Sequence, residues 1–149
     1  MNINATVGHI LQHKGSLVWS VSPDVTVLDA IKTLAERNVG AVLVMRDDEL
    51  IGIFSERDYT RKIILKGRAS NTTHVGEVVS SPVVTVGPDE TVEDCMRLMT
   101  GRHIRHLPVV QSGKVIGVIS IGDLVNWTIS AQKAALEQMQ SYLSGGVPA

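Results

Sequence analysis

With 149 residues the chain is long enough for one compact unit or two very small ones, and its 44% hydrophobic but only 3% aromatic content predicts an aliphatic core. A net charge of -1 gives no electrostatic footprint for nucleic acid or an anionic membrane, and the apolar runs are too short to span a bilayer. One cysteine excludes an intrachain disulfide, and the N-terminus lacks a signal-peptide pattern, so we expect a soluble cytoplasmic protein.

In chain order, the first half of the sequence shows helix, strand and hairpin patterns in turn. The capping box Thr26-x-x-Asp29 predicts a helix start, after which Val27, Ala30 and Leu34 share one face at helical spacing. The wholly apolar run 40–45 predicts a buried strand. The expected elements are a short apolar helix at 7–11, an extended entry at 19–21, a helix at 26–38, strands at 40–45 and 50–54, and a helix at 55–64.

The second half repeats the first at a constant offset of 65 residues, and no gap is needed between residues 18 and 58. The matches include Pro23-Asp24 with Pro88-Asp89, Ile51-Gly52 with Ile116-Gly117, Ser55 with Ser120, and Asp58 with Asp123. Such self-similarity indicates two copies of one supersecondary unit. The expected second-half elements are a short helix at 75–79, a helix at 91–100, strands at 107–110 and 115–119, a helix from about residue 120, and an amphipathic tail helix at 131–143.

Each copy follows the order βαββα, so the fold class is α/β (α+β) with a C-terminal helix. A unit of about 60 residues buries too little surface to be more than marginally stable alone, whereas two units can cover each other. We therefore expect a pseudo-twofold pair, with repeat 1 at residues 7–67, repeat 2 at 74–131, and a helix and tail at 132–149.

Two motifs occur in both copies. Pro-Asp-x-Thr-Val precedes the first helix of each, and Gly-hydrophobic-hydrophobic-Ser-x-x-Asp follows its last strand, at residues 52–58 and 117–123. Together with residues 105–109, Arg-His-Leu-Pro-Val, these motifs make the chain resemble a tandem pair of cystathionine-β-synthase (CBS) domains, or Bateman module. The resemblance covers nearly the whole chain, and no catalytic or transport domain is evident beside it, which indicates a stand-alone pair.

The resemblance implies a regulatory protein that senses adenosyl ligands, namely AMP, ADP, ATP, NAD(H) or S-adenosylmethionine, on behalf of an unknown partner protein. It also implies side-by-side homodimers. An alternative is a structural dimerisation module with vestigial ligand sites, held together by apolar helix faces and the tail at 131–143. We do not expect an enzyme, because no cluster of nucleophile, base and orienting residue is evident, and we expect no catalytic cofactor and no metal site.

An adenine nucleotide needs an apolar slot, an acceptor for the ribose diol and donors for phosphate. Asp58 and Asp123 each follow a strand and can accept from both ribose hydroxyls. Ser55 and Ser120 stand at helix starts, where hydroxyl and backbone N–H groups can meet an oxyanion. Gly122 replaces the Ser or Thr that the family often has there, whereas repeat 1 has Arg57 at that position.

The remaining site candidates are apolar residues that would line the adenine slots and basic residues that would bind phosphate. We expect Val18, Val39, Ala41 and Ile53 to line a slot in repeat 1, and Val83, Ile104, Leu107 and Ile119 to line one in repeat 2, with Pro108 beside it. The phosphate candidates are Arg57, Arg61 and Lys62 in repeat 1, and Arg102, His103, Arg105 and His106 in repeat 2. The sequence does not assign the phosphate donors of one repeat to the ligand of either repeat.

A purely structural interpretation competes with the ligand site. Ser-x-x-Asp is also an ordinary capping box, as in Thr26-x-x-Asp29. A second occurrence directly after a Gly-containing strand favours the ligand site, and one carboxylate can both cap a helix and contact a ligand. Cys95 aligns with Ala30, so we expect a small core residue with no redox role.

Overall fold

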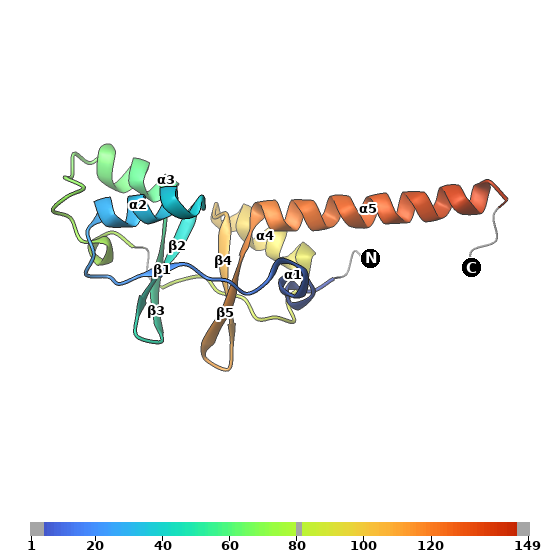
Figure 1. Ribbon diagram of the computed structural model, residues 1–149, viewed down its shortest axis with the longest axis horizontal. Coiled ribbons are helices and arrows are strands. Elements are labelled where there is room, and N and C mark those ends of the chain that lie inside the picture. Colours follow the sequence, from blue (N-terminus) through green and yellow to red (C-terminus); the bar gives the residue numbers. More distant parts are fainter. Residues whose placement is uncertain (1–4, 80–81, 146–149) are drawn as a thin grey trace.

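The computed structural model describes residues 5–79 and 82–145, and it consists of two similar α/β halves whose hairpins lie side by side (Figure 1). The first half contains β1 (Ser20–Val21), α2 (Val27–Arg37), β2 (Ala41–Arg46), β3 (Glu49–Ser55), α3 (Glu56–Asp58) and the π-helical segment η1 (Tyr59–Ile64). The second contains α4 (Val92–Arg102), β4 (His106–Gln111), β5 (Lys114–Ser120) and α5 (Ile121–Leu143). A helix precedes each half: α1 (Val7–Lys14) and the 3-10 turn η2 (Val75–Glu77).

Helices α2 and α4 begin where the sequence predicts, and α4 continues two residues beyond its expected end at residue 100. The hydroxyls of Thr26 and Thr91 accept hydrogen bonds from the backbone N–H groups of Asp29 and Asp94, at 3.2 and 3.1 Å, and so cap α2 and α4. Both helices end at a residue in the left-handed conformation, Asn38 in one half and His103 in the other. His103 therefore stands at the end of α4, where its backbone carbonyl accepts from Nη1 of Arg57 in the first half.

The sheets repeat the same register in both halves. Strands β2 and β3 pair antiparallel with a bulge at Val44/Met45, and β4 and β5 pair with a bulge at the equivalent Val109/Val110. Strand β1 adds to β2 in parallel, whereas in the second half the same pairing is reduced to a single parallel bridge between Val86 and Val109. The strand predicted at 40–45 is present as β2 at 41–46, and its central residues Val42, Leu43 and Val44 are at most 1% exposed.

The helix that precedes each half packs on the opposite half. The N–H of Val7 in α1 donates to the carbonyl of Glu90 at 2.8 Å, and the N–H of Val75 in η2 donates to the carbonyl of Val25 at 2.9 Å. These pairs are pseudo-symmetric, since Glu90 and Val25 are 65 residues apart. The chain is thus tied into one pair by two exchanged helices.

Two hydrophobic cores result from this exchange. The first joins α1 to the second half and contains Ala5, Val7, Ile10, Leu11, Val86, Val92, Cys95, Met99, Leu107, Val109, Ile119 and Leu124. The second joins η2 to the first half and contains Val27, Ala30, Leu34, Val42, Val44, Phe54, Ile63, Val75 and Val78. Cys95 is fully buried, which confirms it as a core residue, and burial followed by the charges of Glu90 and Asp94 raises the pKa of its thiol to about 11.

Two helices differ from the expectation. The helix expected at 55–64 has one α-helical turn and then widens into the π-helix η1, in which the N–H of Leu65 bonds to the carbonyl of Thr60. The final helix and the tail helix form one continuous α5 of 23 residues, whose C-terminal half projects away from the sheets (Figure 1). Within the described residues, no helix is both long and apolar enough to cross a membrane.

Candidate functional site

A pocket of about 580 Å³ lies between the two halves, within the size range of small-molecule sites. The first half provides its β3–α3 junction, and the second half provides residues 82–84 and the start of β4. We call this the first pocket. It is lined by Gly40, Ile53, Ser55, Glu56, Arg57, Asp58, Thr60, Pro82, Val83, Val84, His103, Ile104, Arg105 and His106.

In a second pocket, of about 430 Å³, the two halves exchange the segments that they provide. Here the first half provides its strand entry, the second half provides Val118 and Ser120, and α1 provides Lys14. Ser120 is the equivalent of Ser55, so the two pockets are related by the same pseudo-twofold arrangement as the halves. Its lining is Lys14, Gly15, Leu17, Val18, Trp19, Asn38, Val39, Gly40, Ala41, Val42, Leu43, Ile53, His106, Val118 and Ser120.

The structure corrects the expected slot walls, because each pocket takes residues from both repeats. Val18 and Ala41 face the pocket of Ser120, whereas Val83 faces the pocket of Ser55 and Asp58. Leu107 and Ile119 line neither pocket, since both are fully buried in the core around α1. Pro108 is also buried within β4, so the motif at 105–109 contributes its first two residues to the pockets and its later ones to the fold.

The carboxylate of Asp58 both caps a helix and lines the first pocket. Its Oδ2 accepts from the backbone N–H of Ser55 at 2.9 Å and from the Ser55 hydroxyl at 3.0 Å, while that hydroxyl accepts from the Asp58 N–H. Its Oδ1 lies 3.5 Å from the ammonium of Lys62, one helical turn later. The side chain is 22% exposed, so the cap fixes a partly accessible carboxylate at the pocket wall.

Asp123 has the same cap but a different cation. Its Oδ2 accepts from the N–H of Ser120 at 2.8 Å, and the ammonium of Lys14 lies 2.5 Å from the same oxygen. Lys14 also donates to the carbonyl of Val118 at 2.7 Å, so the last turn of α1 is placed over this carboxylate. Asp123 is absent from the lining of the second pocket, in which Lys14 stands instead. Trp127 occupies the position that Lys62 has in the first half.

The predicted phosphate donors separate into two groups. Arg57, His103 and Arg105 line the first pocket, and Nη1 of Arg57 donates across the pocket to the carbonyl of His103 at 3.5 Å. Arg61 and Arg102 line neither pocket, and the site candidate Gly122, which is not a phosphate donor, lines neither as well. Lys62 lies outside both pocket linings; its ammonium pairs with Asp58 and donates to the carbonyl of Val78 at 3.0 Å.

His106 stands between the two pockets and lines both of them. It begins β4, opposite Ser120, and its imidazole approaches Gly40, where an added Cβ would lie 3.5 Å from Cε1 and Nε2. Burial, followed by the positive charge of Lys14 and more weakly that of Arg105, lowers its pKa below the usual 6.5, against the opposing effects of Asp123 and Glu56. The neutral imidazole can offer an acceptor as well as a donor to a bound group.

Sequence reasoning missed several lining residues, above all Lys14, Glu56 and Thr60. Glu56 and Thr60 are two residues before and after Asp58, a spacing that would place them away from Asp58 on a regular helix, so helical periodicity does not indicate them. Lys14 lies in α1, outside the register of the repeat, so no sequence signal linked it to Asp123. Among the residues that the structure describes, no three His, Cys, Asp or Glu side chains gather as metal ligands.

The fold and the paired pockets together define a tandem α/β repeat module, and comparison with known proteins gives its family. The sequence matches the family described as CBS domain at residues 17–65 and again at 75–130, and the chain therefore belongs to the CBS domain family. CBS-domain proteins are commonly regulatory or signal-transduction modules.

Relatives support this assignment over most of the chain. The mitochondrial CBS domain-containing protein CBSX3 of Arabidopsis thaliana is 38% identical over 96% of this chain and 74% of its own length. A putative signal-transduction protein with CBS domains from Burkholderia ambifaria is 44% identical, with a TM-score of 0.82 over 86% of this chain and 96% of that one. A hexameric CBS-CP12 protein from bloom-forming cyanobacteria is 25% identical, with a TM-score of 0.74 over 97% of this chain and 90% of that one.

Proposed function

We propose that the chain is a regulatory module that binds an adenine nucleotide in the first pocket. One observation carries the proposal: a carboxylate, two arginines and an apolar wall converge on a single pocket between the repeats. Asp58 is available for a ribose diol, Arg57 and Arg105 for phosphate, and Val83 and Ile104 for the adenine ring. AMP, ADP, ATP, NAD(H) and S-adenosylmethionine share the adenosine part that this set would recognise.

The cap of Asp58 supports the ribose role. Because Oδ2 is engaged by Ser55, the carboxylate is held in one orientation before a ligand arrives, and Oδ1 is the oxygen that would accept from the diol. Hydrogen bonds to a charged group contribute about 1.5–3 kcal/mol each. Pre-organisation of this kind reduces the ordering cost of binding.

The place of the pocket suggests how binding would be transmitted. A ligand there touches the β3–α3 junction of one half and the start of β4 in the other, so it stabilises one relative arrangement of the two. A partner protein that distinguishes the arrangements would experience a coupling of typically 1–3 kcal/mol. In this proposal the module modulates that partner and catalyses no reaction itself.

Location and assembly form part of the same proposal. We propose a cytoplasmic protein on the basis of its single cysteine, although the CBSX3 relative is named as mitochondrial, and cell fractionation distinguishes the two. Oligomerisation is supported by the hexameric CBS-CP12 neighbour.

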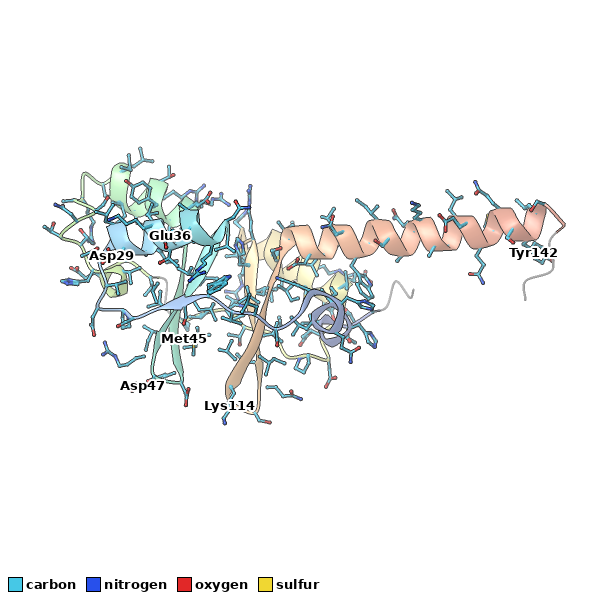
Figure 2. The ribbon with its side chains drawn as sticks, viewed as in Figure 1. Asp29, Glu36, Met45, Asp47, Lys114 and Tyr142 are labelled. Carbon is cyan, nitrogen blue, oxygen red and sulfur yellow. The ribbon has the colours of Figure 1, made fainter. Side chains whose placement is uncertain are left out.

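Equilibrium binding of AMP, ADP, ATP, NADH and S-adenosylmethionine, measured by titration calorimetry, tests the ligand. We expect Asp58→Asn to weaken the tightest ligand by about 10- to 100-fold, since it removes one charged acceptor. Asp29→Asn is the control, because Asp29 lies at the start of α2 (Figure 2), three residues after the capping residue Thr26, and belongs to the lining of neither pocket. The affinity of Asp29→Asn should equal that of the wild type.

The ligand's own hydroxyls provide a second arm. The 2′-deoxy analogue of the same nucleotide should bind the wild type more weakly, whereas Asp58→Asn should no longer distinguish it. If none of the five compounds binds saturably, the nucleotide proposal is wrong. A dimeric protein that is indifferent to nucleotide would then favour a structural module.

A further inference from the structure

The two pockets differ in the charged group that each presents at its helix cap. The first pocket has Asp58 in its lining. Among the residues that the structure describes, those lining the second pocket include no aspartate or glutamate. Asp123, the equivalent of Asp58, pairs with Lys14, and it is Lys14 that stands in the lining. The first pocket therefore presents the acceptor that a ribose diol needs, whereas the second presents a cation at the equivalent place.

Lys14 is held at this place by two acceptors and by the helix that carries it. Its ammonium lies 2.5 Å from Oδ2 of Asp123 and donates to the carbonyl of Val118 at 2.7 Å. About one turn earlier in α1, Leu11 packs on Gly117 of β5 so closely that a Cβ on this glycine would lie 2.7 Å from Cδ2 of Leu11. The end of α1 is thus fixed on β5, and Lys14 extends from a firmly packed helix.

Asp58 takes its cation from a different part of the chain. The helix α1 has eight residues, whereas η2, which packs on the first half, has three. The ammonium beside Asp58 belongs to Lys62, four residues later, at the position that Trp127 occupies in the second half. Lys62 lies outside the lining of the first pocket, so this pairing leaves the Asp58 carboxylate at the pocket wall.

A nucleotide in the second pocket would have to break both contacts of the Lys14 ammonium to reach Asp123. In the empty pocket water can replace lost partners, and the pair itself, with side chains 35% and 21% exposed, contributes little to stability. A ligand that fills the pocket excludes that water. A charged donor left without its partners then lowers the affinity of the ligand at least about tenfold.

We propose that Lys14 prevents a nucleotide from binding in the second pocket, so that each chain binds one nucleotide, in the first pocket. The inference rests on the proposed function and adds to it which of the two related pockets responds to the ligand. Lys14 is the last residue of α1, so the length of this helix determines the choice of pocket.

The stoichiometry of binding to the full chain tests the proposal. AMP, ADP, ATP, NADH and S-adenosylmethionine are titrated in turn in a calorimeter, and the tightest should bind the wild type at one per chain. Lys14→Ala removes the ammonium and should bind two per chain, because the affinity of the second pocket rises at least about tenfold. Circular dichroism should show that this variant keeps its fold.

Lys114→Ala is the matched control. Lys114 lies on the hairpin between β4 and β5 (Figure 2), belongs to the lining of neither pocket, and carries the same charge as Lys14. This variant should bind one nucleotide per chain, as the wild type does.

A second substitution in the Lys14→Ala chain locates the gained site. Adding Asp123→Asn should remove the gained site and return the stoichiometry to one per chain. Adding Asp58→Asn should instead weaken the first pocket and leave the gained site unchanged. A merely structural role of Lys14 would produce neither result, because it creates no new site.

The outcomes separate this proposal from that of the first pocket. A wild type that binds two nucleotides per chain, or a Lys14→Ala variant that still binds one, would overturn the role of Lys14 and leave the first pocket as a nucleotide site. If the wild type binds none and Lys14→Ala binds one through Asp123, the role of Lys14 stands and the first pocket is wrong. Absence of saturable binding to both chains would overturn both proposals.

Discussion

The exchange of η2 onto the first half can be tested by adding one methyl group. A Cβ at Gly76 would lie 2.9 Å from Cβ of Pro23 and 3.0 Å from the Pro23 carbonyl oxygen. Carbon atoms in good contact are about 3.5–4.0 Å apart, so Gly76→Ala creates an overlap of roughly 0.6–1.1 Å. The Gly76 N–H donates to that same carbonyl at 2.9 Å, so the helix cannot retreat without stretching a hydrogen bond.

The expected cost follows from two opposing effects. Overpacking a well-filled contact costs about 1–3 kcal/mol, and the proline ring and backbone leave little room for adjustment. Replacing glycine by alanine recovers about 0.4–1 kcal/mol from the unfolded chain. We therefore expect Gly76→Ala to lower the free energy of unfolding by about 1–2 kcal/mol, or Tm by roughly 2–8 °C.

Thermal and urea unfolding followed by circular dichroism measure this change. Gly101→Ala is the matched control, because Gly101 lies within α4 and nothing stands within 4 Å of an added Cβ. That variant should be stabilised by about 0.5–1 kcal/mol. If Gly76→Ala is as stable as the wild type or more so, the close packing of η2 on Pro23 is not what joins the repeats.

Three further predictions concern titratable groups. Because the pKa of His106 is lowered on folding, the unfolded chain binds more protons below about pH 6.5, so stability should fall as pH decreases from 7 toward 5, and Tm should fall less in His106→Gln. The buried thiol of Cys95, whose pKa is raised, should react with a disulfide reagent at neutral pH only when the protein unfolds. Its reaction rate should therefore increase in urea, and a rate that urea leaves unchanged would contradict this prediction. Lys14→Met should cost less than about 1 kcal/mol, because the pair with Asp123 is partly exposed; a greater loss in calorimetry would show that the pair holds α1.

The sequence by itself was sufficient for the repeat and most of its local structure. These signals are short-range: they are the capping threonines, the helical periodicity of α2 and the apolar run of β2. Each predicts its element correctly because the hydrogen bonds and the buried face that it encodes involve residues close together in the chain. Because the offset is constant, the elements predicted for the first half also predict those of the second. The same offset pointed to Ser55, Asp58 and their equivalents as a pair of related positions.

The composition of each pocket was decided only by the tertiary structure. Because α1 and η2 cross to the opposite half, Val83 and Asp58 line one pocket and Lys14 pairs with Asp123, although the members of each pair are far apart in the chain. Periodicity records which face of an element is buried, but not which element covers it. The local sequence therefore predicts a ligand slot for Leu107, although this residue fills the core that α1 covers.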